Sequence, residues 1–102
     1  MLDEITCLSD KPNYKFSVGL PNGSEYIFHI YYLTRQQYWI MDIQYNDFKC
    51  NGRRIIMTDD LFKDFANILP YAVAIINNKQ QISPIGQNAF TQQGYQMFVM
   101  DR

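Results

Sequence analysis

Histidine and cysteine are scarce in this sequence: His29 is its only histidine, and Cys7 and Cys50 are its only cysteines. No CxxC or HxxxH spacing occurs, so no zinc-ligand pattern is present. Two widely separated cysteines in a chain without a secretory signal are typical of reduced thiols in a cytosolic protein. We therefore expect neither a metal site nor a structural disulfide.

Long apolar runs and an excess of basic charge are also missing. No segment has the roughly 18 consecutive apolar residues that a membrane-spanning helix needs. The opening MLDEITCLSDKP lacks the basic-then-apolar order of a secretory signal. The formal net charge of −1 gives no positive field for a phosphate backbone. We expect a soluble protein, made in the cytoplasm, that binds neither a membrane nor nucleic acid.

Recognisable catalytic and cofactor motifs are absent too. The five glycines stand singly at turns and loops instead of forming a phosphate-binding loop. Asp59 and Asp60 are adjacent carboxylates, but they fall where a helix N-terminus favours negative charge. His29 and Asp42 would be the best residues of an enzyme, and a concave pocket joining them would support that class. We predict no catalytic residue, no cofactor-binding residue and no cofactor.

Apolar and polar residues alternate with a period of two along most of the sequence, and this pattern predicts a series of short strands. Asn22-Gly23 predicts a hairpin turn between the first two long strands, because this pair tolerates positive φ. A second Asn-Gly opens the 50–57 segment, and 82–94 is interpreted as an extended loop. The expected strands are 14–20, 25–33, 38–45, 50–57, 71–77 and 95–100.

One segment has helical rather than strand spacing. Thr58 is a good N-cap, Asp59 and Asp60 follow in the first turn, and Pro70 supplies a stop. The intervening apolar residues recur at the spacing of a helix of about three turns at most. We expect a mainly β fold, a small antiparallel β-barrel or sandwich of about six strands with one short α-helix. Residues 1–102 form a single domain, in which 1–12 are a candidate flexible N-terminal arm.

Aromatic residues make up 16% of the chain, and eight of them are tyrosines. We expect more rings than the core of so small a domain can hold, and tyrosine is enriched at protein–protein interfaces. The adjacent arginines in the 50–57 strand suit an edge charge that blocks unwanted pairing, which we favour over an ion pair with a partner. The interface candidates are Tyr31, Tyr32, Arg53, Arg54, Tyr71 and Tyr95.

A binding module is the alternative to a structural assembly protein. In that alternative a small OB-like domain would bind a peptide, or would stack nucleic-acid bases on Tyr31, Tyr32 and Trp39. The missing basic stripe counts against the nucleic-acid version.

The order of the segments YWIMDI, GRRIIMTDDLFKDFANILPYAVAI and SPIGQNAFTQQGYQMFVM resembles the small baseplate plug proteins of contractile phage tails. The resemblance covers about residues 14 to 100. The matched positions are Phe16, Val18, Trp39, Met41, Asp42, Ile43, Gly52, Asp60, Leu61, Phe62, Pro84, Phe90, Gly94, Phe98 and Val99.

The resemblance implies a non-enzymatic virion component located in the tail baseplate and synthesised in the host cytoplasm. It implies contacts with the hub, the spike and other baseplate proteins near the tail axis, where the plug helps to close the tube until contraction. Several copies per particle are expected around a threefold hub.

Overall fold

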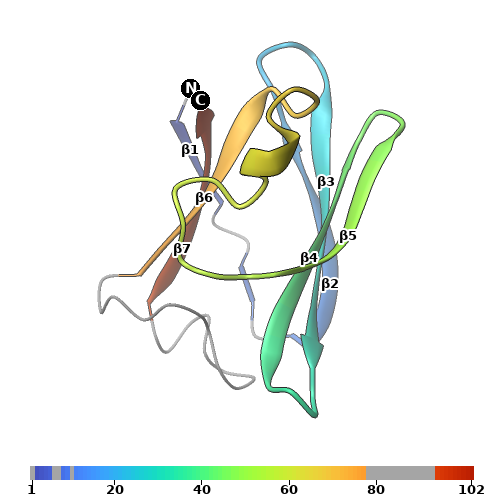
Figure 1. Cartoon of the computed structure of the whole chain (residues 1–102), viewed down its shortest axis with the longest axis vertical. Helices are drawn as coiled ribbons and strands as arrows, with labels where there is room; N and C mark the ends of the chain where they lie inside the picture. The colour runs from blue at the N-terminus through green and yellow to red at the C-terminus, as the bar shows by residue number, and fades with distance from the viewer. Residues whose placement is uncertain (1, 6–7, 10, 78–93) are drawn as a thin grey trace.

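A computed structural model describes residues 2–5, 8–9, 11–77 and 94–102, and within them seven strands form two facing antiparallel sheets (Figure 1). One sheet has the strand order β1-β7-β6 and the other β2-β3-β4-β5. The strands are β1 Leu2–Ile5, β2 Asn13–Gly19, β3 Glu25–Leu33, β4 Tyr38–Tyr45, β5 Phe48–Arg54, β6 Tyr71–Asn77 and β7 Tyr95–Asp101. The mainly β fold is confirmed, and of the two expected architectures it is the sandwich: the described strands do not close into a barrel.

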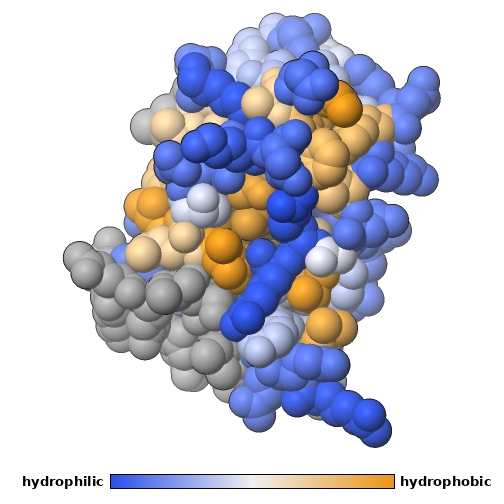
Figure 2. Space-filling view, viewed as in Figure 1, coloured by the Kyte–Doolittle hydropathy of each residue, from blue (hydrophilic) through white to orange (hydrophobic). Residues whose placement is uncertain are grey.

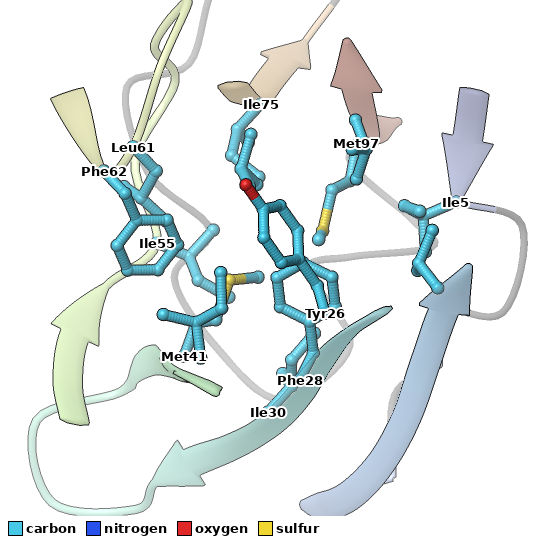
Figure 3. Close-up of a cluster of buried hydrophobic side chains, with 14 of the residues drawn as sticks. Ile5, Tyr26, Phe28, Ile30, Met41, Ile55, Leu61, Phe62, Ile75 and Met97 are labelled. Carbon is cyan, nitrogen blue, oxygen red and sulfur yellow. The ribbon is translucent and has the colours of Figure 1, made fainter. Parts of the chain in front are cut away.

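The core lies between the two sheets, where alternate residues of each strand point inward. In Figure 3 Tyr26 and Phe28 of the four-stranded sheet lie opposite Ile75 and Met97 of the three-stranded sheet. The first two side chains are fully buried, and the last two are 1% exposed. Because both sheets contribute large apolar side chains, burial of this layer is the main source of stability.

The β2–β3 and β4–β5 hairpins of the four-stranded sheet have different residues in their turns. The β2–β3 hairpin turns at Asn22-Gly23 as predicted, with Gly23 at φ 85°. The β4–β5 hairpin turns at Asn46, which has φ 51°, and Tyr45 pairs with Phe48. The second Asn-Gly therefore lies inside β5, which starts and ends earlier than the predicted 50–57 strand. Gly52 has φ 78° beside a shift in the β4–β5 register, so it forms a β-bulge there.

The predicted helix from Thr58 to Pro70 is wrong. The only helical element among the described residues is the short 3-10 turn η1, Lys63–Phe65. Thr58 exchanges two backbone hydrogen bonds of 2.9 Å with Ile75, and the Leu61 N–H donates to the Val73 carbonyl at 2.8 Å. Backbone groups that a helix would use internally are thus bonded to β6, and tertiary pairing overrides the local helical pattern.

The N-terminal segment contains a strand that the sequence did not predict. Leu2–Ile5 form β1 and pair with β7 from Leu2↔Met100 to Ile5↔Met97, so this part of the candidate flexible arm 1–12 is a strand of the sheet. Ile5 is 6% exposed and belongs to the core. Its burial anchors the strand to the core.

Some predictions fall outside the described residues. They are the loop at 82–93, Pro84, Phe90 and the thiol of Cys7. Cys50 is described and has a free, half-buried thiol. No described helix is long and apolar enough to cross a membrane.

Candidate interaction surface

The side chains of the four-stranded sheet that point away from the core form a surface that we call the outer face. This surface carries most of the polar groups of the sheet, arranged in rows that run across the strands. The pairing of β2, β3, β4 and β5 sets which side chains are neighbours on it. The rows are Asn13–Tyr31–Ile40–Arg54, Lys15–His29–Asp42 and Ser17–Ile27–Gln44–Lys49.

Asp42 is the centre of a hydrogen-bond network on the outer face. Its Oδ1 accepts the Gly52 N–H at 2.7 Å and the Tyr31 hydroxyl at 3.2 Å. Its Oδ2 lies 3.4 Å from Nδ1 of His29, whose Nε2 lies 2.7 Å from Oδ1 of Asn13. Burial, followed by the nearby Asp42 carboxylate, raises the pKa of the Tyr31 phenol, which keeps the hydroxyl a donor. The network links all four strands and holds the bulge at Gly52.

A shallow depression of about 180 Å³ lies over this network. It brings His29 and Asp42 together, which is the arrangement that an enzyme would need. Both Asp42 oxygens have donors or a ring nitrogen within 3.4 Å, and each His29 nitrogen faces an acceptor. The depression is lined by Lys15, Ile27, His29, Asp42, Ile43, Gln44, Lys49 and Asn51. These lining residues carry amine, imidazole, carboxylate and amide groups, which can serve as polar contacts for another polypeptide.

Two of the predicted interface residues, Tyr31 and Arg54, lie in the same row of the outer face. The guanidinium carbon of Arg54 lies 3.5 Å from the centroid of the Tyr38 ring, a cation–π contact. Tyr38 was not among the predicted interface residues. Its position four residues before Asp42 in the same strand, and therefore on the same face, is the signal that could have identified it.

Two other candidates, Tyr32 and Arg53, make contacts within the chain instead. The Tyr32 ring packs on Trp39 with centroids 5.2 Å apart on the inner face. Arg53 donates to Asp64 at 2.9 Å and its guanidinium carbon lies 5.6 Å from the ring centroids of Phe62 and Phe65. Arg53 thus ties β5 to the connection that contains η1.

Tyr71 and Tyr95 lie at opposite ends of the β6–β7 pair, opposite Asp101 and Asn77 respectively. Tyr71 is half-buried, and its backbone N–H donates to the Tyr26 hydroxyl at 2.9 Å. Tyr95 is only 5% exposed and is part of the core. The structure therefore does not gather the six candidates into one surface, and the Tyr95 side chain is not available at any surface of the isolated chain.

The tyrosine side chains are less exposed than the sequence analysis predicted. Tyr26 and Tyr95 are buried, and the other six tyrosines are half-buried. Rings pack against one another, as Tyr14 does on Phe16 with centroids 6.0 Å apart. Figure 2 shows apolar patches interspersed with hydrophilic ones on the face in view. Among the residues whose exposure the structure describes, the large hydrophobic ones that are more than a third exposed are Ile56, Ile68 and Ile76.

The predicted base-stacking group does not form. Trp39 is fully buried, and Tyr31 and Tyr32, as neighbours in β3, point to opposite faces of the sheet. A base could not contact all three rings at once.

The Arg53–Asp64 pair gives a testable pH dependence. The hydrogen bond from Arg53 lowers the pKa of Asp64 below its ordinary value. Stability from this pair is present above the unfolded-state pKa of Asp64 and is lost as pH falls through the lowered folded-state pKa. Arg53→Gln is expected to raise the pKa of Asp64 towards its ordinary value, measured by NMR titration of the carboxyl carbon. Arg54→Gln is the matched control, and an equal shift in both variants would contradict the assignment.

Comparison with known proteins gives one result. A family model described as "Cyanophage baseplate Pam3 plug gp18" matches residues 2–102, which include all seven strands. No curated protein matches the sequence.

Proposed function

The chain belongs to the cyanophage baseplate plug family, whose members are structural components of the phage tail, and we propose that it acts by contacting the hub and spike proteins at the tail axis. Several copies per particle, synthesis in the host cytoplasm and the absence of catalysis are parts of the same proposal. So is a single domain over residues 1–102. The description of the family supports the baseplate location, and the surface chemistry supports contact with other polypeptides.

The observation that carries the proposal is the stacked Arg54–Tyr38 pair on the outer face. A guanidinium held 3.5 Å from a ring centroid is already oriented, so less side-chain entropy is lost when a partner covers it. Tyr31 lies two strands away in the same row, and the Ile40 side chain, 7% exposed, lies between them. Tyrosine and arginine around an apolar centre are the side chains enriched in the energetic centres of interfaces.

The proposed function is tested by purifying tails from infected cells that supply the protein with an affinity tag. The wild-type chain is expected to copurify with tail particles, and a photo-crosslinker at Tyr38 is expected to join it to the hub or spike. Finding the protein only as a free monomer in the lysate would refute the proposal.

Arg54→Ala is expected to weaken incorporation into tails, with a loss of about 2 kcal/mol in binding free energy if Arg54 is a central contact. Lys63→Ala is the matched control, because Lys63 is an exposed cation in η1, away from the outer face. Circular dichroism checks that both variants remain folded. If the two variants were incorporated in equal numbers per tail, the assignment of Arg54 to the interface would be contradicted.

A further inference from the structure

The edge strands on the two sides of the sandwich differ in whether another segment is hydrogen-bonded to their free edge. On one side the edge of β6 is occupied, because residues 58–61 bond to it through Thr58 and Leu61. On the other side lie the edge strands β1 and β2, and Figure 3 shows Ile5 of β1 at the side away from Leu61 and Phe62. Within the described part of the chain, β2 pairs only with β3. Among the residues that the structure describes, its far edge is therefore a row of backbone groups without a strand beside it.

The backbone bonds at both ends of β2 show which residues point to that edge. The Pro12 carbonyl accepts the Tyr32 N–H at 2.9 Å, and the Leu20 N–H donates to the Ser24 carbonyl at 2.8 Å. Antiparallel bonding alternates along a strand, so the even-numbered residues between these ends bond to β3. The outward-pointing N–H and C=O groups belong to Asn13, Lys15, Ser17 and Gly19.

The side chains beside this edge define what would fit there. Below the edge, Tyr14 and Phe16 are half-buried, and the Phe16 ring lies 5.4 Å from that of Phe28. On the outer face, Lys15 and Lys49 both line the depression and bring two positive charges to it. The carboxylate of Asp42 also lines the depression, but its oxygens are already engaged by Gly52, Tyr31 and His29. A strand added to the edge would place alternate side chains against the aromatic rings and the others beside Lys15.

We propose that the β2 edge binds an extended strand of another baseplate protein, with apolar residues over Tyr14 and Phe16 and acidic residues beside Lys15. The backbone groups of this edge, which no described strand pairs with, supply main-chain hydrogen bonds, and the alternate side chains supply specificity. A second copy of β2 would match the backbone but would bring another Lys15 into a region that already holds two lysines. Charge complementarity therefore favours the acidic strand. This inference rests on the proposed function, since it names the kind of partner.

Ser17→Pro tests the main-chain contact selectively. The Ser17 N–H points away from β3, so proline removes no hydrogen bond within the sheet, whereas it removes a donor at the open edge and adds a bulky ring there. The variant is expected to fold, as judged by circular dichroism and thermal unfolding, and to appear in purified tails at least about tenfold less often than wild type. Ser17→Ala keeps the N–H and is expected to be incorporated normally.

Lys15→Glu tests the acidic character of the strand without relying on a proline. It is expected to lower the number of copies per tail severalfold, while Lys15→Arg keeps the charge and the wild-type number. Undiminished incorporation of folded Ser17→Pro, or of Lys15→Glu, would overturn the inference while leaving the proposed function intact. Failure of the wild-type chain to copurify with tails would instead refute the proposed function.

A third measurement identifies the occupant. Ser17→Cys carrying a benzophenone label is expected to crosslink within tails to a different baseplate protein. A crosslink that joins two copies of this chain would overturn the choice of occupant.

Discussion

Trp39→Ala is expected to lower the free energy of unfolding by about 4 kcal/mol, because it removes the largest fully buried side chain. Trp39 lies on β4, an interior strand of its sheet, and is fully buried. Its removal leaves a cavity that the rigid strand pair β3–β4 cannot close. The Tyr32 ring, whose centroid lies 5.2 Å from that of Trp39, also loses its aromatic contact. Because small domains are stable by only about 5–15 kcal/mol, much of the margin would be lost.

Urea unfolding followed by far-ultraviolet circular dichroism measures this change, since the only tryptophan fluorophore is itself removed. Tyr38→Ala is the matched control on the preceding residue, which points to the outer face and is half-buried. Its expected loss is about 1 kcal/mol. A similar loss for both variants would contradict the inward orientation of Trp39.

Asp60→Ala is expected to destabilise the fold by about 3 kcal/mol. The Asp60 side chain is 10% exposed, and its Oδ2 accepts a hydrogen bond of 2.7 Å from Nε of Arg102. Its Oδ1 also accepts the backbone N–H groups of Phe62 at 3.2 Å and Val73 at 3.4 Å. Alanine would leave these donors without their carboxylate partner in a largely desolvated position, and this cost exceeds that of a surface ion pair.

The contribution of Arg102 is separated by a double-mutant cycle with Arg102→Gln, using thermal or urea unfolding. A positive coupling energy is expected because the two side chains make two contacts, at 2.7 and 3.3 Å. Asp59→Ala is the control, since Asp59 is exposed and adjacent in sequence. If Asp59→Ala destabilised the protein as much as Asp60→Ala, the buried carboxylate would not be the cause.

The strands could be predicted where both the inner residues and the turn were encoded locally. In β3, alternate residues such as Tyr26, Phe28 and Ile30 are fully buried, so burial follows directly from the period-two pattern. Asn22-Gly23 fixed the β2–β3 turn through the positive φ of its glycine. The second Asn-Gly had the same local signal, but the chain turns at Asn46 and uses Gly52 as a bulge that Asp42 caps at 2.7 Å.

The candidate surface was predictable only in part. Tyr31 and Arg54 lie on the outer face, whereas Tyr95 is buried and Tyr32 faces Trp39. A tyrosine in an alternating strand could face either side until the register of that strand is known. The register depends on the partner strands, which composition does not specify.

The sequence by itself determined the mainly β class, the positions of most strands and the family, because alternation and turn residues act over a few neighbouring positions. Tertiary structure alone decided that residues 58–61 lie along β6 instead of forming a helix, and that Leu2–Ile5 pair with β7. It also decided which tyrosines remain at the surface and that, among the described residues, β2 pairs with a strand on one side only. The physical reason is that backbone hydrogen bonds and buried contacts between distant segments outweigh local propensities of a few tenths of a kcal/mol per residue.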